Sequence, residues 1–386
     1  MRETVDICVV GGGIVGLYCA AELARAGLQV RLIDKAYSGL NRDAAGDITQ
    51  HGHAPGYEDG MADFVRHTIN CWKKAMDEFG EGMGLMPCGS ITFATTEADQ
   101  NRLLAEQVTD AQHRMASHWL AGKAEVESFL GGIKLGDAVR GVKFNSNDMA
   151  VDTHTVMDTL RRQLVNYGVR VWGSDVAKEF LVNMFGDVCG VRTEAGDECL
   201  AKHTLVCAGM FAGQLLKPLG VNLPLRPVRC HVAEVERFGH LPVAVVVQPM
   251  ERGYLRIRRL NEKRALVAYD GMFDPAQTTF SKVVDDATVA WMMAEAGKLL
   301  PALHNATVHE VHTFPMAMTP DMAPAVGTYP KRKGLLIAAG MCGYSYAYAA
   351  GVADVLVRLV NGDEVELGAI AADRFATGKW SSLEFK

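Results

Sequence analysis

Short apolar runs and stretches with helical periodicity alternate along the first part of this chain. The run VDICVV at 5–10 predicts a buried strand. It leads directly into GGGIVG at 11–16, and the small and apolar residues of 14–26 predict a helix that ends at Gly27. The next apolar run, QVRLID, ends on Asp34. This order of strand, turn, helix and strand predicts the first unit of a mainly parallel sheet.

A second group of apolar runs predicts a sheet of another kind. The stretches GSITFAT, HVAEVER, VAVVVQ, GYLRIRR and RALVAYDG lie between residues 89 and 271 and are typical of antiparallel strands. Residues 186–209 predict a hairpin that turns at Ala195-Gly196, followed by a buried strand that ends on Gly209. The stretch 286–300 has apolar residues at helical spacing and predicts a packing helix.

The glycine turn indicates a dinucleotide. Gly11 permits the tight turn, Gly13 lets the backbone approach a pyrophosphate, and Gly16 lets the helix pack closely on the strand. The phosphates are expected on the free N–H groups at the start of the helix. Asp34 lies eighteen residues after Gly16, where its carboxylate can accept hydrogen bonds from both ribose hydroxyls. We therefore assign to the nucleotide Gly11, Gly13, Ile14, Val15, Gly16, Asp34 and Lys35.

The C-terminal part favours FAD over NAD. Residues 319–351 contain a proline turn, the buried run GLLIAAG and a glycine-rich loop, which opens a helix from about Tyr346 to Val360. The positive end of a second helix of this kind stabilises a reduced, anionic flavin. A plain NAD dehydrogenase does not need this second loop.

With these features the chain resembles the D-amino acid oxidase-like family of FAD-dependent oxidoreductases, which includes glycine oxidase, sarcosine oxidase and flavoprotein subunits of amine dehydrogenases. The resemblance covers nearly the whole chain. It is carried, in order, by GGGIVG with Asp34 and Lys35, DAAGD at 43–47, the run at 71–99, VDTHTVMDTLRRQL at 151–164, the block at 168–209, and TPDMAPAVG to AAGMCGYS near the C-terminus.

The resemblance implies an FAD that is bound without a covalent link. Relatives that attach FAD through histidine have it where this chain has Asp43, and the attachment cysteine of sarcosine oxidase corresponds approximately to Phe314. The further cofactor contacts that the resemblance implies are Ala45, Gly46, Val176, Ala208, Gly209, Gly340, Met341, Gly343 and Tyr344.

The expected fold is α/β, with an FAD/NAD(P)-binding Rossmann-like domain and a second α+β substrate domain built on an antiparallel sheet. We assign residues 1–80, 145–218 and 318–386 to a discontinuous FAD-binding domain, and 81–144 and 219–317 to the substrate-binding domain. No linker rich in Pro, Gly and Ser separates them, so both are expected to share one cleft.

The reaction that the resemblance implies is oxidation of the C–N bond of an amino acid or secondary amine by hydride transfer to the flavin, which gives an imine that hydrolyses. Two alternatives stay open: an FAD-dependent 2-hydroxy acid or polyol dehydrogenase, and a flavin-binding assembly or electron-relay subunit with a degenerate substrate site. The electron acceptor, O2 or a partner protein, also stays open. The oxygen-activating lysine of sarcosine oxidase corresponds here to Leu266, with Lys263 and Arg264 nearby.

The arginines that bind the substrate carboxylate in the relatives are missing. Met316 stands about where glycine oxidase has its arginine, and Gly52 stands close to that of sarcosine oxidase. Three explanations are open. An arginine from another strand (Arg229, Arg256 or Arg258) could hold the carboxylate, the substrate could carry its carboxylate at a different distance, or the substrate could have no carboxylate. In GYLRIRR, Arg256 and Arg258 alternate and point to one side, either into the cleft or to solvent as a basic edge strand. The candidates for substrate contact and catalysis are His51, Tyr254, Arg256, Arg258 and Tyr344.

Composition narrows the class of partner. The net charge of −6 provides no electrostatic footprint for nucleic acid or for an anionic membrane, so a small-molecule partner is expected. The nine cysteines include no CxxC pair, and no spacing predicts a metal site. Three glycines interrupt the N-terminal apolar stretch, which therefore predicts neither a signal peptide nor a membrane span. We expect a cytoplasmic protein that forms a homo-oligomer or a hetero-oligomer.

Overall fold

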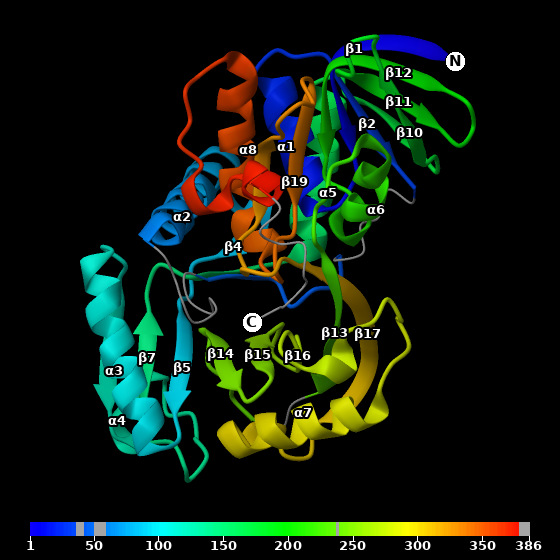
Figure 1. The fold of residues 1–386 in the computed structure, drawn as a ribbon. Coiled ribbons are helices and arrows are strands. Elements are labelled where there is room, and N and C mark those ends of the chain that lie inside the picture. Colours follow the sequence, from blue (N-terminus) through cyan, green and yellow to red (C-terminus); the bar gives the residue numbers. More distant parts are fainter. Residues whose placement is uncertain (36–41, 50–58, 237–238, 378–386) are drawn as a thin grey trace.

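Two β-sheets dominate the structure, a computed structural model that describes residues 1–35, 42–49, 59–236 and 239–377 (Figure 1). In the first sheet β9, β2, β1, β12 and β19 run parallel to one another, and β10 and β11 extend it as antiparallel strands. Its strands are β1 (Arg2–Val10), β2 (Val30–Asp34), β9 (Arg170–Gly173), β10 (Ala177–Val182), β11 (Val188–Thr193), β12 (Glu198–Val206), β18 (Ala325–Thr328) and β19 (Leu335–Ala339).

Helices cover this sheet. Helix α1 (Ile14–Arg25) connects β1 to β2 and is buried along most of its length, because α5 (Thr153–Asn166) and α8 (Ser345–Asn361) pack on it. Helix α2 (Asp59–Phe79) lies against the outer side of α8, and the short α6 (Ala212–Leu216) follows β12. The predicted first strand, glycine turn and helix are confirmed, as is the hairpin between β11 and β12.

The second sheet has the strand order β17-β13-β16-β15-β14-β5-β7-β6. Its bounds are β5 (Ser90–Ala94), β6 (Ser117–Ala121), β7 (Gly141–Asn145), β13 (Arg226–Glu236), β14 (Val245–Met250), β15 (Gly253–Arg259), β16 (Arg264–Tyr269) and β17 (Thr307–Met318). The strands pair antiparallel as predicted, except that β14 and β5 run parallel. Where the first sheet faces this one, a small sheet joins β3 (Asp47–Ile48), β8 (Met149–Val151) and β4 (Leu85–Met86).

The outer face of the second sheet is covered by α7 (Asp286–Leu299) and α4 (Lys123–Phe129), whose apolar side chains form a separate core with Ile91, Val246 and Ile257. Side chains alternate along a strand, so the residues of β15 and β16 that adjoin these core residues in sequence point to the other face of the sheet, toward the first sheet. The assignment of whole segments to two domains stays a prediction.

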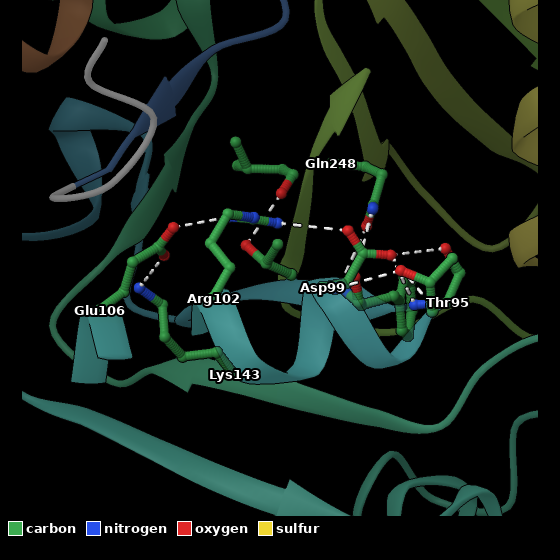
Figure 2. Close-up of polar contacts among 10 residues, drawn as sticks. Thr95, Asp99, Arg102, Glu106, Lys143 and Gln248 are labelled. Carbon is green, nitrogen blue, oxygen red and sulfur yellow. Dashed lines mark hydrogen bonds and ion pairs between the residues drawn. The ribbon is translucent and has the colours of Figure 1, made fainter. Parts of the chain in front are cut away.

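An ion-pair network attaches α3 (Glu97–Gln112) to the end of the second sheet (Figure 2). The Lys143 side chain on β7 is 1% exposed, and its Nζ lies 2.8 Å from Glu106 Oε2 and 3.3 Å from Asp110 Oδ2. Arg102 also donates to Glu106, at 2.5 Å, and Thr96 with Asp99 forms a capping box at the start of α3. A buried ammonium group needs such paired carboxylates, so this network holds α3 in one position.

Lowering the pH from about 6.5 to about 4 is expected to destabilise the fold through His231 on β13. This side chain is fully buried and its Nε2 accepts the backbone N–H of Asp285 at 3.2 Å. Burial and then the nearby charge of Arg229 lower the pKa of His231 from 6.5 to about 4. The unfolded chain therefore binds a proton in this range that the fold does not, and up to about 3 kcal/mol of stability is lost as the pH falls.

The variant His231→Gln tests this pH dependence, since glutamine retains an acceptor but does not titrate. Urea unfolding at pH 7, 5 and 4 should show a smaller loss of stability for the variant than for the wild type. Equal losses in both proteins would contradict the assignment to His231.

None of the helices in the described ranges is long and apolar enough to span a membrane.

Candidate functional site

A cavity of about 750 Å³ lies between the two sheets. One wall consists of the segments that follow the carboxyl ends of β1, β2, β12 and β19, and the opposite wall comes from β13, β15, β16 and β17. Ligands of open α/β sheets bind at this edge of the strands. The cavity reaches from Asp34 to Arg256, so that the nucleotide turn and a buried cation share one space.

The glycine turn at residues 11–16 has the close backbone contacts that its sequence predicts. Gly11 has φ +110°, and a Cβ there would lie 2.4 Å from the Cys207 carbonyl oxygen. A Cβ on Gly16 would lie 1.8 Å from the carbonyl oxygen of Gly11. Gly13 caps α1 without a side-chain hydrogen bond, and Asp34 accepts the Gly12 N–H at 2.8 Å. The start of α1 is thus built to leave amide groups for an anion.

A second glycine-rich loop lies on the same cavity, at the start of α8. Gly340 has φ +66°, and a Cβ there would lie 2.5 Å from Thr319 Cγ2. Tyr344 caps α8 without a side-chain hydrogen bond, and Gly343 lines the cavity just before it. Gly46 has φ +70° and passes so close to β8 that a Cβ would lie 2.4 Å from the Val151 carbonyl oxygen. The two helix starts without side-chain caps fit the pyrophosphate and the flavin of FAD, and the carboxylate of Asp34 at the end of β2 fits the ribose.

Most of the predicted cofactor residues line this cavity, and two do not. Gly16 is buried in the contact between α1 and the turn, as its predicted packing role requires. Tyr344 points toward Arg256 instead of forming part of the lining. Those that do line the cavity are Gly11, Gly13, Ile14, Val15, Asp34, Lys35, Ala45, Gly46, Val176, Ala208, Gly209, Gly340, Met341 and Gly343.

Arg256 on β15 is the central charged group of the opposite wall. It is 6% exposed, donates through Nη1 to Asp270 Oδ2, and donates through Nε to Asp47 Oδ2 at 3.3 Å. Its guanidinium carbon lies 5.7 Å from the ring centroid of Tyr254 and 5.6 Å from that of Tyr344. Its third nitrogen, Nη2, is buried and has no hydrogen-bond partner within the described ranges.

The charges around Arg256 keep it protonated. Burial alone would lower the pKa of Arg256, but the carboxylates of Asp47 and Asp270 outweigh burial and raise it well above its usual value. Burial also raises the pKa of Tyr254 to about 12 and holds the pKa of Tyr344 well above its usual value, so neither phenol acts as a base at neutral pH. Both tyrosines instead pack on the cation and hold it in place.

The other candidate arginines lie away from the cavity. Arg258 is also buried, at 3% exposed, but it donates to the Val151 carbonyl oxygen at 3.0 Å and forms no part of the lining. The alternative of a solvated edge strand is wrong, because β15 lies between β14 and β16. Arg229 faces the outer side of the sheet, where it donates to Gln277 and to the Val283 carbonyl oxygen.

Two apolar residues stand where the resemblance places functional groups of the relatives. Met316 and Phe314 line the cavity. Arg264 pairs with Glu234 and does not reach the lining. His51 lies outside the described residues.

Sequence reasoning missed Asp47, Asp270 and Lys282, all of which line the cavity. Asp47 is the last residue of DAAGD, directly after a glycine predicted to contact the flavin, which was a usable signal. Asp270 follows the strand RALVAY and accepts the backbone N–H groups of Tyr254 and Met272, at 2.9 and 3.3 Å. For Lys282, no pattern in the sequence pointed to the cavity.

The chain is similar in sequence to known proteins. The family model described as DAO: FAD dependent oxidoreductase matches residues 6–359. Glycine oxidase of Bacillus licheniformis is 21% identical over 379 residues, which cover 96% of this chain and 97% of that protein. Human mitochondrial dimethylglycine dehydrogenase is 22% identical over 403 residues, covering 100% of this chain but 46% of the relative, so the chain spans about half of that protein.

The fold is shared with solved structures. The crystal structure of glycine oxidase from Geobacillus kaustophilus superposes with a TM-score of 0.84 at 21% sequence identity, and the match covers 96% of this chain and 99% of that one. This similarity confirms the predicted α/β fold with a Rossmann-like nucleotide-binding part.

Proposed function

Because the chain belongs to the family of FAD-dependent oxidoreductases, we propose that it oxidises the C–N bond of a small amino acid or N-substituted amino acid whose carboxylate is held by Arg256. The family membership agrees with the resemblance and the FAD cofactor predicted from the sequence. The observation that carries the proposal is Arg256 itself, a buried cation that lines the cavity and whose Nη2 has no hydrogen-bond partner within the described ranges.

Binding of FAD is assigned to the two glycine loops. The pyrophosphate would lie on the amides at the start of α1, with the ribose hydroxyls at Asp34 and the adenine near Val176. The flavin would lie between Ala45-Gly46 and the loop of Gly340 to Gly343, close to the start of α8. Bound FAD supplies the two-electron acceptor for the hydride of the substrate's α C–H bond. We propose that it is held without a covalent link, since Asp43 and Phe314 stand at the positions of the relatives' attachment residues.

The neighbours of Arg256 orient it for a carboxylate. Asp270 and Asp47 occupy two of its nitrogens and the two tyrosines confine its plane, so Nη2 is the donor left for a ligand. A charge-assisted hydrogen bond in a buried site contributes strongly to affinity and positions the α carbon of the substrate.

Asp47 supports the choice of an amine. Its described contacts, from Thr49 and Arg256, both go to Oδ2. The other oxygen, Oδ1, can accept an N–H of the substrate amine. Arg256 with its two carboxylates carries a formal charge of −1, which favours a substrate with an ammonium group over a simple hydroxy acid.

Anaerobic mixing of the FAD-loaded protein with single compounds tests this proposal. The panel contains D- and L-amino acids, N-methyl amino acids, cyclic imino acids, the amines that correspond to them without a carboxylate, and 2-hydroxy acids. We expect flavin absorbance to be bleached by one class of amino acids and not by its decarboxylated amines. Bleaching by hydroxy acids alone would favour a hydroxy acid dehydrogenase, and bleaching by no compound would favour an electron-relay subunit.

The same samples test the electron acceptor. Air is admitted to one portion of the reduced protein and an artificial electron acceptor is added to another. The two rates of flavin reoxidation distinguish an oxidase from a dehydrogenase. A dehydrogenase would reoxidise slowly in air and rapidly with the acceptor.

A further inference from the structure

We propose that His67, Cys71 and Asp354 form a binding site for one Zn²⁺ ion between α2 and α8. These residues lie outside the cavity and take no part in the proposed oxidation. His67 and Cys71 are four residues apart and share one face of α2, and Asp354 comes from α8, which packs against it. The proposal is independent of the substrate.

The spacing of the three side chains suits a tetrahedral ion. His67 Nε2 lies 3.0 Å from Asp354 Oδ2, and Cys71 Sγ lies 3.6 Å from His67 Nε2. All three ligand atoms lie within 4.8 Å of one another. Around Zn²⁺, with bonds of about 2.0–2.3 Å, neighbouring ligands in a tetrahedron are about 3.3–3.6 Å apart. A shift of a few tenths of an ångström between His67 Nε2 and Asp354 Oδ2 brings this pair to that separation. Cys71 Sγ and the Asp354 carboxylate, at most 4.8 Å apart, would have to approach each other by about 1.3 Å at most.

The helices that carry the ligands are firmly joined. Thr68 Oγ1 donates to the Ala347 carbonyl oxygen at 2.8 Å and accepts the Gly351 N–H at 2.9 Å. The indole N–H of Trp72 donates to the Tyr346 carbonyl oxygen at 3.0 Å. These contacts lie next to His67 and Cys71 in α2, so the site is positioned in advance and loses little freedom when a metal binds.

The chemistry of the ligand set selects the metal. A thiolate, an imidazole and a carboxylate are ligands of Zn²⁺, whereas Mg²⁺ and Ca²⁺ prefer oxygen atoms alone. The side chains of His67 and Asp354 are 36% and 39% exposed, which leaves the fourth position open to water and gives the ion access from solvent. The nearby cations Arg358 and Lys74 oppose a bound ion, but both side chains are exposed and can turn away.

The site is tested by treating the FAD-loaded protein with a chelator, removing the chelator, and then titrating the protein with Zn²⁺ in a calorimeter. We expect one equivalent to bind and the melting temperature to rise with Zn²⁺ concentration. Cys71→Ser and Asp354→Asn should weaken binding at least about tenfold. The matched control is Cys189→Ser, because Cys189 is another partly exposed cysteine, on the distant β11, and its loss should leave binding unchanged.

Two results would overturn the proposal. One is the absence of saturable Zn²⁺ binding, in which case His67 and Asp354 form an ion pair only. The other is Cys71→Ser binding Zn²⁺ as tightly as the wild type. Should Cys71→Ser lose its flavin or its fold, alkylation of the wild type decides: Zn²⁺ must slow modification of Cys71, measured by mass spectrometry, while Cys189 reacts at its usual rate.

Discussion

Replacing Arg256 with lysine is expected to lower kcat/KM for the amino acid substrate about 100-fold, while kcat/KM for the corresponding amine without a carboxylate stays the same. Lysine retains the positive charge between Asp47 and Asp270 but lacks the planar fork of the guanidinium, whose Nη2 we propose as the donor to the substrate carboxylate. Loss of one hydrogen bond to a charged group costs about 3 kcal/mol, which corresponds to this factor. Steady-state rates with both compounds measure the effect.

Arg258→Lys is the matched control for Arg256→Lys. Arg258 is buried on the same face of the same strand but donates to the Val151 carbonyl oxygen outside the cavity. It should change stability without discriminating between the two compounds. Arg256→Met is less suitable, because it leaves Asp47 and Asp270 close together and partly desolvated, whereas the double variant Arg256→Met/Asp270→Asn removes one of these charges. An equal loss of activity with both compounds would show that Arg256 does not hold the carboxylate.

Gly11→Ala should produce the second large effect, a loss of FAD affinity of at least about 100-fold. The added Cβ would lie 2.4 Å from the Cys207 carbonyl oxygen, and φ +110° is a conformation that alanine rarely adopts. The backbone must move at the point where the start of α1 would bind the pyrophosphate, and the amides lose their alignment. Titration of the apoprotein with FAD, monitored by quenching of flavin fluorescence, measures the affinity.

Gly27→Ala separates backbone strain from the steric clash in this experiment. Gly27 also has a positive φ, +90°, but a Cβ there has nothing within 4 Å. Alanine at this position should cost about 1–2 kcal/mol of stability and leave FAD binding intact. Wild-type FAD affinity in Gly11→Ala would contradict the role of the turn, and an equal loss in both variants would point to strain alone.

The elements expected to bind the nucleotide were predictable from the sequence of short segments. Strand, glycine turn, helix and terminal acid follow one another within residues 2–34, and each depends on neighbours only a few residues away. The loop before α8 was recognisable for the same reason, as were the strands of the second sheet, whose apolar positions alternate. The α/β fold and the FAD family predicted from these patterns are confirmed.

The charged wall of the cavity, which we propose binds the substrate, depends on contacts between distant segments. Alternation in β15 put Arg256 and Arg258 on one side of the strand, but only the pairing of β15 with β14 and β16 decided that this side is buried. Asp47 and Arg256 meet across 209 residues of chain, and no local pattern encodes such a contact. The elements that we assign to FAD were therefore determined by residues close together in the sequence. The charged cluster around Arg256 was decided by the order of the strands and by the packing of one sheet on the other.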